Sequence, residues 1–316
     1  MSAAPAYVPV PMDSLVGENP LAFDLYLQLN TKHVLYLRKG GAFDGSRVDK
    51  MREKKVQNLY ILAEEEGRYR DFYERKLDDA YAGQGTQPAE QRMALVTQAQ
   101  VTAVEDLLRH PESVASYTTA KTGASKLTQM FLKDDEAIKS ILMNREKYAS
   151  VAAHGVAVAG LAVAIAKKLG LEDSKDLPLL TLGCLLHDGG LFNTDLDESM
   201  PVAEMSDAQK KIYKEHPSLG VRGAQELVHF DQHVLKVIHE HHECIDGSGF
   251  PKGQREKDMH FFSIIAATAD AFEHYIRMEP DSLNSALKRF VVERIGRHPL
   301  DHINALKSVV AGCLKS

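Results

Sequence analysis

Apolar residues recur at helical spacing from about residue 90 almost to the end of the chain. The segments 95–110, 118–132 and 135–170 each place apolar side chains at positions i, i+3 and i+4, which is the pattern of an amphipathic helix. Within the last segment, the run from Val156 to Ala166 is entirely apolar. A membrane-spanning helix needs about 20 such residues. The pattern therefore predicts a helical bundle that contains one buried helix, without a membrane span.

The first 84 residues follow a different pattern. Short runs rich in Val, Leu and Tyr, bounded by Pro, Gly and Asn, predict strands within 6–12, 23–29, 33–40 and 56–62. Helical spacing predicts helices within 46–55 and 67–81. The Gly/Gln/Pro-rich segment 82–91 is the expected break between domains. We expect a small α+β domain over 1–84, followed by a linker and connecting helices over 85–146.

The composition is that of a globular protein and excludes several classes. The chain has 316 residues, is 44% hydrophobic and carries a formal net charge of −6, which argues against a general binder of nucleic-acid polymers or membrane surfaces. The N-terminal segment lacks a basic stretch followed by an apolar one, so no signal peptide is expected. Three scattered cysteines do not form a disulfide framework, and the cytoplasm is the expected location.

Histidine is unevenly distributed along the chain. Ten of the 14 histidines fall between His154 and His274. Five predominantly helical segments in this stretch offer side chains of the types that bind metals. These side chains are His154, the pair His187-Asp188, His216, the pair His241-His242, and Asp270.

Two of these residues, Asp188 and Asp270, are carboxylates within apolar segments. A buried carboxylate without a partner is costly, so such groups are paired or coordinate metals. Any one residue of the set could instead make a single local hydrogen bond, but that explanation is poor for all of them together. Imidazoles with a bridging carboxylate suit first-row metals such as iron, manganese or zinc. Two metals about 3.5–4 Å apart can activate a water and clamp a phosphodiester, which predicts a hydrolytic site for phosphate esters.

The order of these residues, H…HD…H…HH…D, resembles that of the HD superfamily of metal-dependent phosphohydrolases. The segment HHECIDGSGFP at 241–251 is similar to the HHExxDGxGYP segment of the HD-GYP subfamily, which hydrolyses cyclic di-GMP in bacteria. The similarity covers residues 147 to about 280. It implies a mainly α-helical fold, with an HD-type helical metal domain over 147–316 after the small α+β domain. The residues of the motif loop are Asp246, Gly247, Gly249, Phe250 and Pro251.

The resemblance also implies roles for individual residues. The ligands of one metal would be His154, His187, Asp188 and Asp270. The other metal would be held by His216, His241 and His242, with Asp188 as the bridge, and His187 and Asp188 would be the catalytic pair. The metals would be iron, with manganese as the alternative. Family members that bind a third metal use a Glu at the position of Ser150, so we expect two divalent metal ions.

Several positions depart from the family pattern. The lysine of the family motif HDxGK is replaced by Leu191, and Phe250 replaces the tyrosine of GYP. Two arginines of the family fall at Ser263 and Glu279. The residue types suited to metal binding are thus retained, whereas cations suited to phosphate binding are lost at these positions.

Three functions follow as expectations. The first is hydrolysis of cyclic di-GMP or a related cyclic dinucleotide, or of another small phosphodiester, by two-metal activation of a bridging hydroxide. The second is a catalytically weak or inactive metal-containing module that binds a cyclic nucleotide, with a protein partner at the GFP loop or the N-terminal domain. The third is an HD hydrolase acting on another nucleotide, with replacement cations drawn from Lys210, Lys211, Lys214, Arg222, Lys252, Arg255 and Lys257.

Overall fold

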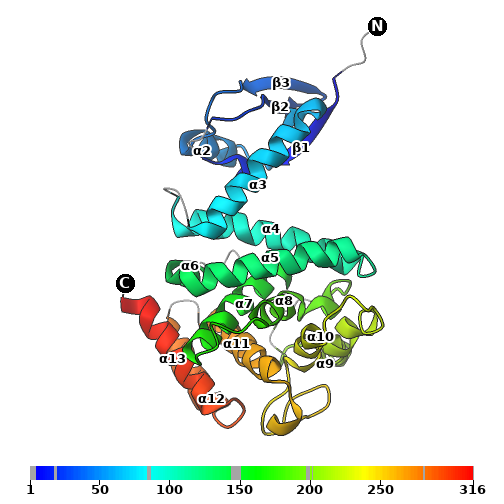
Figure 1. Ribbon diagram of the computed structural model, residues 1–316, viewed down its shortest axis with the longest axis vertical. Helices are drawn as coiled ribbons and strands as arrows, with labels where there is room; N and C mark the ends of the chain where they lie inside the picture. Colours follow the sequence, from blue (N-terminus) through cyan, green and yellow to red (C-terminus); the bar gives the residue numbers. More distant parts are fainter. Residues whose placement is uncertain are drawn as a thin grey trace. The chain divides into compact units, whose positions relative to one another are not determined.

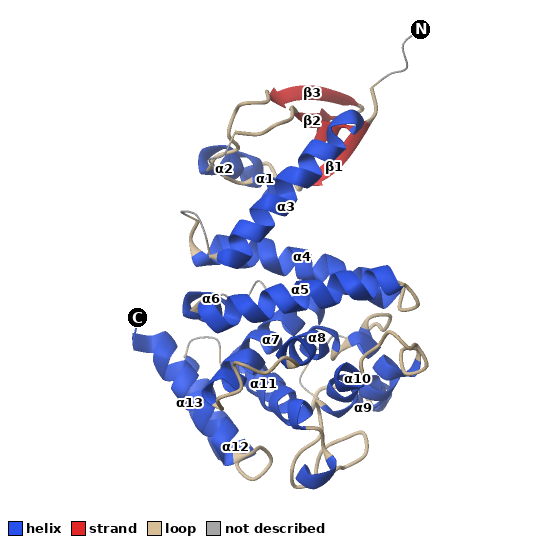
Figure 2. Ribbon diagram, viewed as in Figure 1, coloured by secondary structure: helices blue, strands red, loops and turns tan. Residues whose placement is uncertain are grey.

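The computed structural model describes residues 5–17, 20–83, 87–143, 151–196, 200, 202–279 and 282–315. The chain divides into two units, Met1–Gly85 and Thr86–Ser316. The first unit contains a small antiparallel sheet with helices, and the second is helical (Figure 2). The predicted fold class, mainly α-helical with a small α+β domain at the N-terminus, is confirmed.

The first unit is built on a four-stranded antiparallel sheet with the order β1-β4-β2-β3. Three strands fall within runs that the sequence predicted, and β3 begins at Lys32, one residue before the predicted run 33–40. The bounds are β1 Tyr7–Pro11, α1 Met12–Leu15, β2 Leu25–Leu29, β3 Lys32–Leu37, α2 Gly45–Glu53, β4 Asn58–Leu62 and α3 Glu66–Ala82. Phe23, Phe43 and Ile61 are fully buried in its core, and Tyr69 and Phe72 of α3 pack against that core.

The second unit is a bundle arranged around α7 (Figure 1). Its helices are α4 Ala89–Arg109, α5 Val114–Lys133, α6 Asp135–Met143, α7 Val151–Lys168, α8 Leu177–Leu186, α9 Asp207–Arg222, α10 Gln232–Glu240, α11 Phe261–Met278, α12 Leu283–Arg294 and α13 Leu300–Lys315. Helix α7 contacts α4, α5, α6, α8, α11 and α13. A helix that is apolar on all sides needs such surroundings, and residues 153–166 are all buried.

The segment 85–146 contributes α4, α5 and α6, and all three pack against α7. Helix α5 also packs along α8. In the described part of the chain, no helix is long and apolar enough to cross a membrane.

Close backbone packing brings the segment after α8 against α9. Gly190 lies in the 3-10 turn η3, Gly189–Leu191, and a Cβ atom there would overlap the carbonyl oxygen of His216. Only a glycine lets the two backbones approach this closely. The approach places Asp188, just before the turn, beside His216 of α9.

Candidate metal centre

The structure brings together all seven side chains that the sequence singled out as metal ligands. Helix α7 carries His154, α9 carries His216 and α11 carries Asp270. His187 caps the C-terminus of α8 and Asp188 follows it, while His241 and His242 follow α10. His242 is partly exposed and the other six are buried.

Three of the histidines have one ring nitrogen committed to the backbone. The Nδ1 atoms of His187, His216 and His241 lie 2.6, 2.7 and 2.8 Å from the carbonyl oxygens of Cys184, Tyr213 and Ile238, each three residues earlier. A carbonyl oxygen only accepts hydrogen bonds, so these Nδ1 atoms are donors. In the neutral rings, Nε2 is therefore left with a free lone pair, which is the state a metal ligand requires.

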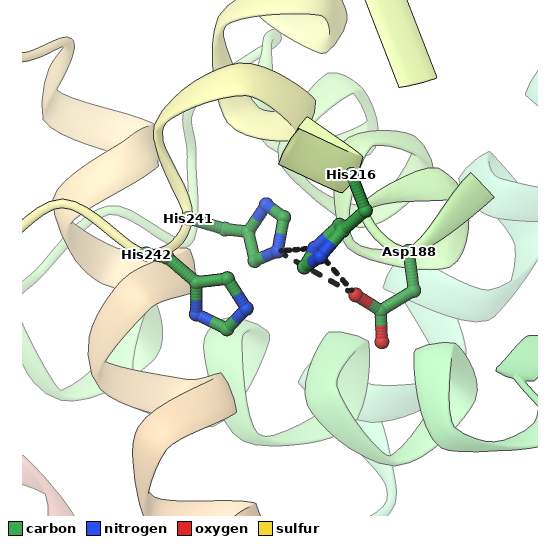
Figure 3. A group of neighbouring side chains, drawn as sticks. All are labelled: Asp188, His216, His241 and His242. Atoms are coloured by element: carbon green, nitrogen blue, oxygen red, sulfur yellow. Dashed lines mark hydrogen bonds and ion pairs between the residues drawn. The ribbon is translucent and has the colours of Figure 1, made fainter. Parts of the chain in front are cut away.

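The two oxygens of Asp188 face different histidines. Its Oδ1 lies 3.1 Å from His216 Nε2 and 3.5 Å from His241 Nε2. Figure 3 shows these contacts, with His242 beside the group. Its Oδ2 lies 3.2 Å from His187 Nε2 and 3.7 Å from His154 Nε2. One carboxylate thus lies between two groups of histidines.

Asp270 also faces histidines of both groups. Its Oδ1 lies 3.2 Å from His154 Nε2 and 3.6 Å from His187 Nε2. Its Oδ2 lies 3.5 Å from His242 Nδ1. The family resemblance placed Asp270 in the His154 group, and the contact with His242 was not expected.

The spacing of these atoms suits metal ions. Bonds of about 2.0–2.2 Å from a metal to nitrogen or oxygen place neighbouring ligand atoms roughly 3–3.6 Å apart. Two clusters have converging ligand atoms, one of Asp188, His216, His241 and His242 and one of His154, His187 and Asp188. Moreover, His216 Nε2 and His241 Nε2 lie 3.0 Å apart. In the neutral rings the proton is on Nδ1, so the lone pairs of the two Nε2 atoms face each other and repel. A cation between them would remove this repulsion.

The carboxylates and two of the histidines are in the ionisation states that metal binding needs. Burial opposes ionisation of Asp188, but the neighbouring histidines, His187 first, hold its pKa well below the usual range. The pKa of Asp270 is likewise held well below its usual range, by His154 and His187 against the effect of burial. Burial lowers the pKa of His241 to about 4 and that of His242 well below its usual value.

A buried carboxylate lies next to Nδ1 of His154 and is paired with an arginine. Neither residue was predicted from the sequence. Glu273 Oε2 lies 3.0 Å from His154 Nδ1, and Arg277 Nε lies 2.8 Å from the same carboxylate oxygen. The two residues follow Asp270 on α11 at i+3 and i+7, so helical spacing from Asp270 could have identified them.

The motif loop is held by hydrogen bonds to two carboxylates. Buried Glu243 accepts from the backbone nitrogens of Lys252 and Gln254 at 2.7 and 2.9 Å. Asp246 accepts from the backbone nitrogen and hydroxyl of Ser248 at 2.9 and 2.7 Å. The turn passes through Gly247, whose φ is 81°.

The same loop places an aromatic ring over the histidines. A Cβ atom at Gly249 would overlap the backbone of His242 and Cys244, so glycine allows the loop to lie against this segment. The ring of Phe250, which precedes Pro251, lies 4.6 Å from that of His242 and 5.5 Å from that of Tyr213 between centroids.

A cavity of about 290 Å³, the site cavity, opens over these residues and includes His154, Asp188, His242 and Asp270 in its lining. Among the described residues, five lysine and arginine side chains line it: Lys210, Lys214, Arg277, Arg294 and Arg297. Two of the replacement cations expected from the sequence, Lys210 and Lys214, are thus in place. The other five, Lys211, Arg222, Lys252, Arg255 and Lys257, are not among its lining residues, and the three arginines were missed.

The positions that depart from the family pattern carry no cation into this cavity. Leu191 is a buried apolar part of the lining. Ser263 is buried within α11, and Glu279 pairs with Arg289 at 3.0 Å. Ser150, on which the expected metal number depended, lies outside the described residues.

Comparison with known proteins identifies the family. Residues 127–292, more than half of the chain, match the family model described as HD domain. A solved structure from Bdellovibrio bacteriovorus, described as an HDG"Y"P protein, is 34% identical, with a TM-score of 0.80 over 97% of this chain and 100% of that one. The chain belongs to the HD family and to its HD-GYP subfamily.

Curated relatives of this HD-GYP protein are cyclic-dinucleotide phosphodiesterases. A cyclic di-GMP phosphodiesterase of Pseudomonas aeruginosa is 26% identical over 170 residues, which is 53% of this chain and 34% of that protein. A 3′3′-cGAMP-specific phosphodiesterase of Vibrio cholerae is 29% identical over 127 residues, 40% of this chain and 29% of that protein. The chain therefore spans about a third of the length of the curated relatives it matches.

Proposed function

We propose that this HD-GYP protein is a metal-dependent phosphodiesterase that hydrolyses cyclic di-GMP or a related cyclic dinucleotide. The observation that carries the proposal is the position of Asp188, with one oxygen facing His216 and His241 and the other facing His187 and His154. Such a carboxylate suits a bridge between two cations. The names of the relatives support the substrate class.

Each part of the site has a role in this proposal. One ion would be held by His154, His187, Asp188 and Asp270, and the other by Asp188, His216, His241 and His242. The ions would be iron, with manganese as the alternative. When bound, they would supply Lewis-acid activation of a water and of the phosphodiester.

The contacts of the histidines and the cations of the cavity prepare the site for an anionic substrate. Hydrogen bonds to backbone carbonyl groups fix the rings of His187, His216 and His241, so the rings need not reorient when they bind a metal. The lysines and arginines of the site cavity compensate the charge of a phosphodiester, and this compensation is strongest where water is excluded.

One observation favours a second candidate, a metal-containing module that binds a cyclic nucleotide with little turnover. Leu191 leaves an apolar side chain in the cavity lining beside Asp188. A cation missing at this point would lower stabilisation of the developing negative charge without preventing binding.

Turnover separates the two candidates. Anaerobically purified protein, loaded with iron or manganese, is assayed against a panel of cyclic and linear nucleotides, with Asp188→Asn as the matched variant that keeps shape and removes charge. The proposal expects a cyclic dinucleotide to be linearised by the wild type and not by Asp188→Asn. Tight binding of cyclic di-GMP without cleavage would instead favour the binding module.

A further inference from the structure

The end of α12 and the turn that follows it bring two arginines, Arg294 and Arg297, to the wall of the site cavity. The match to the family model ends at residue 292. These arginines therefore lie beyond the part of the chain that the family describes, and the seven candidate metal ligands do not involve them.

The backbone of this turn is attached to both segments that flank the metal centre. Ile245 N, three residues after His242, donates to Arg297 O at 3.0 Å. The next residue, His298, is buried, and its Nδ1 lies 3.2 Å from the hydroxyl of Thr268, two residues before Asp270. The turn is thus held in a defined position relative to Asp270 of α11 and to His242.

Arg294 and Arg297 differ in the contacts that their guanidinium groups already make. Arg294 Nε donates to the Tyr275 hydroxyl at 3.1 Å, and its guanidinium lies 5.6 Å from the centroid of the Tyr275 ring. Arg297 is exposed, and its guanidinium forms no ion pair with any residue that the structure describes. By contrast, Arg277 is paired with Glu273. Arg297 is therefore a cation at the cavity wall that is not engaged in a direct ion pair, and the Asp246 carboxylate, whose pKa it helps to lower, lies within its electrostatic range.

A cyclic dinucleotide needs such a cation. It carries two phosphodiesters with one negative charge each, and only one of them can lie over the metal centre during cleavage. The other would bring its charge into a cavity whose lining also includes Glu243. An arginine presents its donors as a planar fork that matches phosphate oxygens, and such charge-assisted bonds are the strong ones.

We propose that Arg297, with Arg294 beside it, binds the phosphodiester that is not being cleaved and so selects cyclic dinucleotides over smaller diesters. The inference rests on the proposed function and names the residues that determine its substrate class. Lys210 and Lys214 on α9 are the competing candidates, because they line the same cavity. They are point charges on flexible stems, whereas the Arg297 backbone is held on two sides.

The test compares two substrates in the metal-loaded full chain. Cyclic di-GMP occupies both the metal centre and the proposed subsite, whereas bis(p-nitrophenyl) phosphate has a single phosphodiester and reports on the metal centre. Arg297→Gln is expected to raise KM for cyclic di-GMP roughly 10- to 100-fold, the range for loss of a hydrogen bond to a charged group. The same substitution should raise KM for bis(p-nitrophenyl) phosphate by a factor at least about 10-fold smaller than the factor for cyclic di-GMP. Arg222→Gln is the matched control, because Arg222 is exposed and is not among the lining residues.

Each outcome decides the inference. An equal KM for cyclic di-GMP in Arg297→Gln and Arg222→Gln would overturn it, and so would a larger effect from Lys214→Gln. If the wild type cleaves neither substrate, the proposed function fails, and equilibrium binding of fluorescent cyclic di-GMP decides the subsite. Binding weakened by Arg297→Gln alone would support the subsite without catalysis, whereas no binding, or equal binding by all variants, would overturn it.

Discussion

Glu273 Oε2 lies 3.0 Å from Nδ1 of His154, while the other ring nitrogen, Nε2, lies 3.2 Å from Asp270 Oδ1. Burial alone would lower the pKa of His154, but the carboxylate of Glu273 raises it to about 9. The pKa of His187 is also raised well above its usual value, by Asp188 against the effect of burial. In the metal-free protein both rings are therefore protonated near neutral pH, whereas a ligating imidazole must be neutral.

Metal binding should consequently release protons. Near neutral pH, His241 and His242 are already neutral because their pKa values are lowered, so the protons come from His154 and His187. Affinity for the metal at the His154 group should rise as pH increases towards about 9, the pKa of His154. Calorimetric titration of metal into the metal-free protein, in buffers of different ionisation enthalpy, measures the release. Binding without proton release would contradict this description.

Removing the charge of Glu273, which lies next to His154 Nδ1, should weaken metal binding at the site that contains His154. Glu273→Gln keeps the shape of the side chain and removes the anion, so we expect metal affinity to fall about 10- to 100-fold and proton release to decrease. Glu226→Gln, at an exposed position, is the control. Equal metal affinity and proton release in the two variants would show that Glu273 has no such role.

Much of this site could be predicted from the sequence, because its residues occur in short segments with recognisable chemistry. His187-Asp188 and His241-His242 combine metal-binding types with apolar helical surroundings, and the run from Val156 to Ala166 required burial. Glu273 was within reach of the same reasoning through its spacing from Asp270.

The cations of the cavity could not be predicted in this way. The turn that carries Arg297 is held in place by contacts with Ile245 N and the Thr268 hydroxyl. Both contacts join residues distant in sequence, and no local pattern indicates them. The tautomers of the histidines likewise depend on backbone carbonyl groups rather than on residue type.

Gly190→Ala should disrupt the approach of Asp188 to His216. The new Cβ atom would overlap the carbonyl oxygen of His216 and lie 2.8 Å from Gly220 N, and backbone atoms cannot move aside cheaply. We expect a loss of about 1–3 kcal/mol in the free energy of unfolding, measured by denaturant titration, together with reduced metal content.

Gly189→Ala provides the comparison for that variant. Its Cβ atom would meet Leu108 Cδ2 at 2.7 Å, the flexible end of a side chain. This variant should therefore be affected less. Equal stability of the two variants would contradict the importance of backbone packing at Gly190.

Limited proteolysis tests the domain boundary expected from composition. The Gly/Gln/Pro-rich segment 82–91 contains the division between the units Met1–Gly85 and Thr86–Ser316. Exposed segments between domains are preferred sites of cleavage. A protease should cut there first and leave a helical fragment that retains metal. First cleavage within α7 or α8 would show that the boundary is misplaced.

The most direct test of the account is the metal content of Asp188→Ala, measured by elemental analysis beside Asp270→Ala and the wild type. Asp188 is the proposed bridge, so its loss removes a ligand from both ions and leaves imidazoles buried without a cation between them. We expect two metals per chain in the wild type and at most one in Asp188→Ala. Two metals per chain in Asp188→Ala, or none in the wild type, would contradict it.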